Sequence, residues 1–347
     1  MHKIIPALAA VFLLVGCASS GSSGSAGKGE KKVPEWVHNP RSKYNEAQFV
    51  SAVGQGSSRE AAEKSATNAL VSIFGQNIKG ETTINERYTE ALRNGTITVT
   101  EDSSLSRDMT SSVSMNSVIG AEIKDVWDDG SGMFYAVSVM DKIKASPTYA
   151  GLLETNEETI AKLTDIEDKT TFDAYARYDL AATIADTSLQ FVNVLSIINP
   201  AQAAAKRGSL SSADTFRLEC VSIAQNIPVE VVVHGDREDR IKSAFSGVLA
   251  TSGFKTGKSD SRYFIEVSFS LTEAVLVNNA NKFVRYIIDA RLTDRETGKV
   301  LLPFSLNGRE GHTSVSEAEN RALRTTELKI KSEYSLRFSE FLTKLTR

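Results

Sequence analysis

Two stretches near the C-terminus alternate apolar and polar side chains. They are RYFIEVSFSL at residues 262–271 and FVRYIIDARL at residues 283–292. A period of two places every second side chain on the same face of a sheet, so each stretch predicts a half-buried strand. A sheet with one apolar face is stable only when a second layer covers that face. This part of the chain must therefore fold as at least two layers.

The second layer is predicted from the flanking sequence. A strand at residues 228–234 and a helix capped by Asp236 and ended by Gly253 precede the alternating stretches, and the turn DRETGK leads to a further strand, VLLPFSL. The order β-α-β-β-β-α predicts a two-layer sandwich over residues 216–347. The closing helix presents apolar or small side chains at four-residue spacing: Ala318, Ala322, Thr326, Ile330, Tyr334, Phe338 and Leu342.

The stretch VSAVGQGSSREAAEKSA, residues 50–66, joins an apolar strand to a helix through two glycines spaced G-x-G. A dinucleotide fingerprint needs a third small residue where this chain has Arg59, and a P-loop needs a Lys-Ser/Thr pair that is missing after the second glycine. We therefore predict a structural corner, with Gly54 and Gly56 in unusual backbone conformations and Ser57 capping the helix. Weak anion affinity at this helix N-terminus stays open.

The surrounding sequence predicts a first domain over residues 34–147. Pro34 and Pro40 bracket a segment that is expected to be extended, with Trp36 as its buried anchor. Two β-rich runs flank DDGSG, which predicts a hairpin, and Pro147 is expected to close the domain.

Residues 80–118 are harder to interpret. ETTINERYTEALRNG favours a helix that ends at Asn94-Gly95, whereas the Ser/Thr-rich part that follows has no sustained period. That part fits either a mobile loop or exposed strands.

Residues 148–215 predict a helical segment and a linker. Thr155 and Glu158 form a capping box for one helix, and a second helix runs from Phe172 to Asn199-Pro200. Residues 201–215 are interpreted as a linker. The whole chain is thus predicted to be α+β: two small two-layer α/β sandwich domains with mainly antiparallel sheets, joined by a helical segment.

The end of that second helix, LQFVNVLSII, is apolar nearly all round, which indicates burial. A membrane span is the weaker interpretation, because polar residues interrupt any window of the required length. They are Asp179, Asp186, Gln190 and Asn193.

The N-terminus, MHKIIPALAAVFLLVGC, places one cation before a short apolar run and a cysteine. The run is shorter than the ~20 residues that span a bilayer and has the flanks of a secretory signal peptide. Leu14-Val15-Gly16-Cys17 resembles the lipobox of bacterial lipoproteins. The resemblance implies that residues 1–16 are removed as a signal peptide. It also implies that Cys17 becomes the lipid-bearing first residue, with palmitate among the acyl chains that we expect.

Residues 17–33 follow as the lipidated cysteine and a flexible Ser/Gly tether, because this composition cannot bury apolar surface. Ala18 stands where the best-known inner-membrane retention signal has Asp. The resemblance therefore implies an outer-membrane location, on the periplasmic face or the cell surface.

The net charge argues against nucleic-acid binding, and the cysteine content argues against an internal disulfide. The formal net charge is -3, without the concentrated Lys and Arg that nucleic-acid binding requires. The two cysteines leave Cys220 alone once Cys17 is lipidated, so no internal disulfide is expected. Its apolar surroundings predict an inert, buried thiol.

No residue of the sequence can be assigned a catalytic, cofactor-binding or metal-binding role. His38, His234 and His312 are isolated from other ligands, and no zinc or nucleophile motif occurs. Three acidic clusters are interpreted as solvated or helix-capping groups, although a paired-carboxylate glycosidase stays an alternative. They are Asp165/Glu167/Asp168, Asp236/Glu238/Asp239 and Asp125/Asp128/Asp129.

The first domain resembles the LPP20 family of bacterial lipoproteins. The matching pieces are PEWV with Asn39-Pro40, FVSAVGQG, the helix SREAAEKSATNAL and the hairpin DVWDDGSGMFYAVSVM, within about residues 34–145. The domain is also similar to the N-terminal module of the flagellar H-ring assembly protein. The resemblance implies an outer-membrane lipoprotein whose domains contact other proteins, and it transfers no active site.

The sequence thus predicts a membrane-attached, non-catalytic scaffold or protein-binding module, in or near an envelope, flagellar or transport assembly. An envelope protein is the expected partner, and no cofactor is expected. The alternative is an envelope hydrolase or a small-ligand carrier. The sequence leaves the oligomeric state open.

Overall fold

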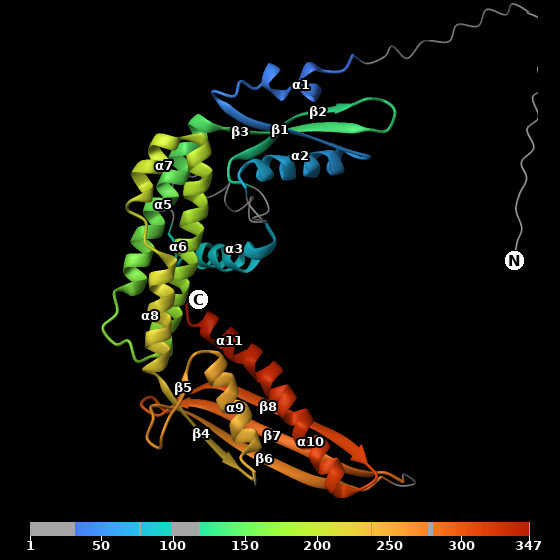
Figure 1. Cartoon of the computed structure of the whole chain (residues 1–347), viewed down its shortest axis with the longest axis vertical. Helices are drawn as coiled ribbons and strands as arrows, with labels where there is room; N and C mark the ends of the chain where they lie inside the picture. The colour runs from blue at the N-terminus through green and yellow to red at the C-terminus, as the bar shows by residue number, and fades with distance from the viewer. Residues whose placement is uncertain (1–31, 76–77, 99–117, 237, 277–279, 347) are drawn as a thin grey trace, which may run out of the picture. The chain divides into compact units, whose positions relative to one another are not determined.

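The computed structural model describes residues 32–75, 78–98, 118–236, 238–276 and 280–346 (Figure 1). The predicted signal peptide, Cys17, most of the tether and most of the Ser/Thr-rich stretch lie outside these residues. From Pro34 onward the chain forms one compact unit. It contains helices and two mainly antiparallel sheets, so the predicted α+β class is confirmed.

The first sheet has the strand order β1-β3-β2, with β1 (Phe49–Gly56), β2 (Ala121–Asp128) and β3 (Phe134–Asp141). Strand β3 pairs antiparallel with both β1 and β2, and β2 and β3 form the predicted hairpin. Helix α2 (Arg59–Ile73) covers one face of this sheet (Figure 1). The hairpin prediction holds because DDGSG supplies the turn, with Gly130 at a φ of 79°.

The glycine corner differs from its prediction. Strand β1 continues through Gly54 to Gly56, and neither glycine has a positive φ. Their role is close approach: a β-carbon on Gly56 would lie 2.6 Å from the β-carbon of Ala61 in α2. The cap is Ser58 and not Ser57, because the Ser58 hydroxyl accepts a hydrogen bond of 3.1 Å from the backbone amide of Ala61.

The segment between Pro34 and Pro40 was predicted to be extended, and this prediction is wrong. The segment contains the short helix α1 (Glu35–His38) and is followed by the 3₁₀ turn η1 (Pro40–Ser42). Pro34 occupies the N-cap position of α1, and Pro40 is the first residue of η1, where the missing amide costs nothing. Trp36 is buried against the face of β3 that lies opposite α2, together with Val137 and Val139. The anchor role predicted for Trp36 is therefore confirmed.

Helix α3 (Ile78–Arg93) confirms the predicted helix before Asn94-Gly95. Helix α5 (Lys142–Thr164) begins directly after β3, because the Asp141 carboxylate caps it. Pro147 lies inside this helix and does not end an element, and Thr155 and Glu158 are internal positions and not a cap. The predicted capping box is wrong, because an acidic residue earlier in the chain supplies the cap. Pro147 removes only one backbone bond near the helix start, so the helix continues through it. The predicted domain limits themselves stay predictions.

Helix α6 (Phe172–Ile198) ends as predicted, but residues 201–215 are not a simple linker. They contain most of α7 (Pro200–Arg207) and the start of α8 (Ala213–Gln225), because Asn199 caps α7 and Ala203 is buried. Within the described part of the chain, α6 alone is long and apolar enough to cross a membrane, and 67% of its most apolar stretch is buried inside the protein. It packs as a core helix.

The second sheet has the order β5-β4-β6-β7-β8. Strand β4 is parallel to β5 and β6, whereas β6, β7 and β8 are antiparallel. One face is covered by helices α9, α10 and α11, as Figure 1 shows. The strands are β4 (Pro228–His234), β5 (Lys255–Thr256), β6 (Tyr263–Ala274), β7 (Lys282–Asp294) and β8 (Val300–His312).

The covering helices are α9 (Arg240–Thr251), α10 (Val315–Lys329) and α11 (Ser335–Lys344), with the π-helical turn η2 (Ile330–Tyr334) between the last two. All seven predicted inward residues of the closing helix are buried. A four-residue spacing drifts around an α-helix of 3.6 residues per turn, and the wider π turn reduces that drift. Asp236 does not occupy the cap position, which is Asp239, but its carboxylate accepts the backbone amides of Arg240 and Lys242.

Candidate functional site

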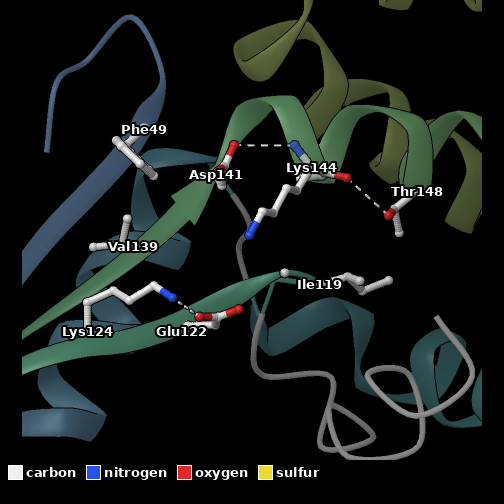
Figure 2. A pocket seen from close by; sticks show the side chains of 10 residues that line it. Phe49, Ile119, Glu122, Lys124, Val139, Asp141, Lys144 and Thr148 are labelled. Carbon is white, nitrogen blue, oxygen red and sulfur yellow. Dashed lines mark hydrogen bonds and ion pairs between the residues drawn. The ribbon is translucent and has the colours of Figure 1, made fainter. Parts of the chain in front are cut away.

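A surface cavity of about 270 Å³ lies where β2 and β3 meet the start of α5 (Figure 2). Gly120 directly precedes β2 with a φ of 84°, and its position against the β-carbon of Ala145 brings that strand to the helix. The cavity is lined by Phe49, Ile119, Gly120, Glu122, Lys124, Val139, Asp141, Lys144, Ala145 and Thr148. Because these residues come from three separate segments, at positions 49, 119–124 and 139–148, the sequence alone did not indicate the cavity.

The two carboxylates of this cavity already have partners. Glu122 forms an ion pair with Lys124 on the same strand. The Asp141 carboxylate accepts the backbone amide of Ile143 at 2.9 Å and that of Lys144 at 3.3 Å. Both acids therefore have structural roles, and a ligand would have to compete with these partners for either carboxylate.

Lys144 is the cation available to a ligand. Figure 2 shows its side chain extended into the cavity, and its ammonium group makes no ion pair with the residues that the structure describes. The Thr148 hydroxyl donates to the carbonyl of Lys144 at 3.3 Å, which fixes the helix turn below it. Because this ammonium group is positively charged, the cavity suits a small anionic ligand. The lining residues include no Ser, Cys or His that could act as a nucleophile–base pair.

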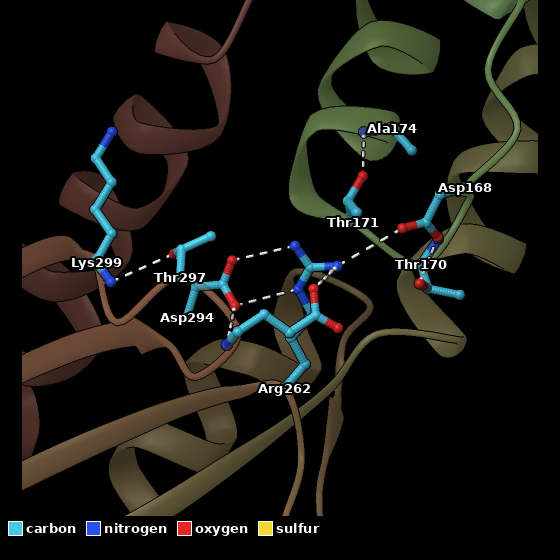
Figure 3. Close-up of polar contacts among 9 residues, drawn as sticks. Asp168, Thr170, Thr171, Ala174, Arg262, Asp294, Thr297 and Lys299 are labelled. Carbon is cyan, nitrogen blue, oxygen red and sulfur yellow. Dashed lines mark hydrogen bonds and ion pairs between the residues drawn. The ribbon is translucent and has the colours of Figure 1, made fainter.

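A second polar cluster surrounds Arg262 at the start of β6 (Figure 3). Its guanidinium donates two hydrogen bonds to Asp294, at 3.2 and 3.1 Å, and pairs with Glu296 at 2.8 Å. It also lies 3.6 Å from Asp168, in the loop between α5 and α6. Burial alone raises the pKa of Asp294, but the hydrogen bonds from Arg262 and from the Glu296 amide outweigh it and lower that pKa. This is a stabilising network.

The acidic clusters of the sequence are thus separated by the fold. Asp168 joins the Arg262 network, and the Asp236 carboxylate accepts backbone amides at the start of α9. Asp125 accepts hydrogen bonds from Lys43 at 2.6 Å and from the Tyr44 hydroxyl at 2.5 Å. Burial opposes the ionised form of Asp125, yet these donors lower its pKa overall. The structure brings none of the three clusters together into one site.

The three histidines and Cys220, which the sequence offered as candidate site residues, lie in different helices and strands. His234 lies 3.8 Å from Glu266, and both side chains are exposed. Among the residues whose placement is described, no group of three or more His, Cys, Asp or Glu side chains is arranged to hold a metal ion. Cys220 is buried, and this burial, with the nearby charge of Asp179, raises the pKa of its thiol to about 12. The prediction of an inert thiol is consistent with these surroundings.

Residues 34–141 match the family model of the LPP20 lipoproteins. This segment of the chain is similar to the LPP20 family. The LPP20 domain contains the first sheet, α2 and α3, and it ends where α5 begins. It is about a third of the chain, and the match confirms the predicted resemblance over these residues. The similarity to the flagellar H-ring module stays a prediction.

Solved structures of several bacterial proteins are similar to parts of the chain. The secreted protein HP1454 from Helicobacter pylori is 13% identical, with 81% of this chain and 97% of that chain covered and a TM-score of 0.39. A minor lipoprotein from Acinetobacter baumannii is 11% identical over 34% of this chain and 93% of its own, with a TM-score of 0.26. The rare lipoprotein B from Shewanella oneidensis is 12% identical over 34% and 94%, with a TM-score of 0.24. Among curated proteins, the chain has no match.

Proposed function

We propose that the protein is a lipoprotein attached to the outer membrane through acyl chains on Cys17. The observation that carries this proposal is the order of the chain: a lipobox-like sequence, a Ser/Gly tether and then the LPP20 domain from residue 34. Two or more acyl chains suffice for stable attachment, whereas one gives only marginal binding. The tether lets the folded domains stand off the lipid surface.

The proposed role at the membrane is to bind or scaffold other envelope proteins without catalysis. Large apolar side chains on the outside of the helices support this role, since they offer contact area to a partner. Leu218 and Val221, one turn apart on α8, are 72% and 52% exposed. A flagellar or transport assembly is the setting that the H-ring resemblance suggests.

The membrane attachment is tested by labelling cells with a traceable palmitate analogue. We expect the wild-type protein to carry label and to sediment with membranes, and Cys17→Ala to lose both properties. Cys220→Ala is the matched control, because it removes the other cysteine of the chain and should keep label and sedimentation. Equal labelling of the wild type and Cys17→Ala would rule out the proposed anchor.

The scaffold role is tested by crosslinking the mature protein in membranes and identifying its partners. We expect one or a few partners in stoichiometric amount. Paired substitution of Leu218 and Val221 by Ser should weaken their recovery if α8 forms the contact. Recovery of no stoichiometric partner would contradict the scaffold.

A small-ligand carrier is the second candidate, and the cavity that contains Lys144 is the observation that favours it. A carrier should bind a small anion with an affinity that falls in Lys144→Gln. The substitution Lys64→Gln, at an exposed position of α2, is the control. An envelope hydrolase is the weaker alternative, because both carboxylates of the cavity have structural partners.

A further inference from the structure

Two arginines lie directly opposite each other on the face of the second sheet that points away from α9 and α10. Arg285 of β7 is the register partner of Arg309 of β8, and Thr272 of β6 is the register partner of Arg285. Directly opposed residues of antiparallel strands project from the same face. All three are exposed, while Val284 and Tyr286 on the other face are buried. The three side chains therefore form one exposed row across three strands.

An aromatic ring positions one of these arginines. The guanidinium of Arg309 lies 5.3 Å from the ring centroid of Phe283. Phe283 is the register partner of Gly311, and a β-carbon at position 311 would lie 2.5 Å from the ring. Glycine thus leaves room for the ring, and the ring holds the guanidinium by a cation–π contact. Stacking of this kind leaves the N–H edge of a guanidinium available for hydrogen bonds in its plane.

The charge of this row is not balanced by the residues that the structure describes. Neither Arg285 nor Arg309 forms an ion pair with a described side chain, whereas Arg291, further along the same face of β7, lies 4.0 Å from Glu266. The next acid on this face of β7 is Asp289, four residues or about 13 Å from Arg285. It accepts a hydrogen bond from Ser305 at 2.7 Å. Like charges directly opposite each other destabilise a sheet, so the row favours an anion that neutralises both.

We propose that Arg285, Arg309 and Thr272 form a binding site for a phosphate group. Two guanidinium groups match the charge of a phosphate dianion, and their planar donor edges match its oxygens in bidentate pairs. The threonine hydroxyl supplies one further donor. Because the row lies on an open sheet face, it suits a phosphate at the end of a larger molecule. That phosphate belongs either to a lipid headgroup or to a soluble compound, and its chemistry at the site is the same.

This inference goes beyond the proposed function and does not depend on acylation of Cys17. The test uses the full chain with Cys17→Ser, so that acyl chains do not dominate the result. One measurement is the shift in melting temperature caused by inorganic phosphate relative to chloride at equal ionic strength. The other is cosedimentation with phosphatidylcholine vesicles, with and without phosphatidic acid.

We expect phosphate to stabilise the parent chain and to have no effect on the double variant Arg285→Gln/Arg309→Gln. Each single variant should bind phosphate at least about tenfold more weakly, because each loses charge-assisted hydrogen bonds. Arg291→Gln is the matched control on the same strand face and should respond like the parent. Lys at both positions keeps the charge but not the planar fork, so it should restore only part of the affinity.

The two measurements distinguish the sources of phosphate. Binding to phosphatidic acid vesicles that the double variant loses identifies a lipid headgroup, whereas a response to inorganic phosphate alone identifies a soluble phosphate. Either result supports the site. The proposal is overturned if the parent responds to neither probe, or if the parent and the double variant respond equally.

Discussion

Gly54 of β1 lies directly against the backbone of Ala66 in α2: a β-carbon at position 54 would lie 2.0 Å from the amide nitrogen of Ala66. Two residues along the strand, Gly56 has the same relationship to the start of the helix. Ala62 and Ala66 are fully buried, so small side chains on the helix and glycines on the strand meet in one closely packed interface. The G-x-G spacing therefore serves helix–sheet packing.

The first prediction concerns this interface. Gly54→Ala should destabilise the protein by about 3 kcal/mol or more. The added β-carbon would meet backbone atoms of α2, and a helix backbone cannot move aside as easily as the end of a flexible side chain. Gly151→Ala is the control: it lies in α5 with no atom near its added β-carbon, and it should stabilise by about 0.5–1 kcal/mol. Urea unfolding measures both, and an unchanged midpoint for Gly54→Ala would contradict the packing role.

The second prediction compares two buried tyrosines. The Tyr88 hydroxyl donates to the Asn156 carbonyl oxygen at 2.8 Å, and Asn156 donates in turn to Ser188 at 2.9 Å. Tyr88→Phe leaves Asn156 underpaired in the core and should cost about 1–3 kcal/mol. The Tyr334 hydroxyl is buried without a hydrogen-bond partner among the described residues, so Tyr334→Phe should be neutral or stabilising. Equal effects of the two substitutions in denaturant unfolding would show that this distinction is wrong.

The third prediction concerns the Arg262 network. Arg262→Ala should destabilise by about 2–3 kcal/mol, because it removes charge-assisted hydrogen bonds from the buried Asp294. The control is Arg177→Ala, which breaks the exposed pair with Asp173 on α6 and should cost no more than about 0.5 kcal/mol. Thermal unfolding at neutral pH ranks the two variants, and equal losses would speak against a special role for Arg262.

The same network predicts a pH dependence. Because the pKa of Asp294 is lower in the folded than in the unfolded protein, its contribution is complete above the unfolded value of about 3.9. The contribution is lost as the pH falls from there through the folded pKa. Asp294→Asn should therefore reduce the steepness of acid destabilisation below about pH 4. Stability curves that keep the same slope in both proteins would exclude this linkage.

The fourth prediction concerns the thiol of Cys220. With its pKa raised to about 12 by burial, the thiolate is roughly a thousandfold less populated than in a free cysteine. In the Cys17→Ser chain, iodoacetamide should modify Cys220 slowly in the folded state and quickly in urea. Mass spectrometry follows both reactions, and rapid modification of the folded protein would disprove the inert assignment.

Patterns that repeat along the chain predicted their elements well. Alternation in β6 and β7 and the four-residue spacing of the closing helix each sum over many positions, so tertiary contacts did not override them. Single-residue signals were less reliable. Pro147 and Thr155 each suggested a boundary, yet α5 runs through both because Asp141 caps it earlier and neighbouring helices bury its length.

Local periodicity and turn chemistry were enough to predict the α+β class, the hairpin, the strands of the second sheet and the buried face of the last helix. Three relationships became visible in the folded chain alone: Gly54 and Gly56 make room for a helix, Lys144 points into a cavity, and Arg285 lies opposite Arg309. These relationships join residues that are far apart or on different strands. Strand register and helix docking set such neighbours, and no single stretch of sequence encodes them.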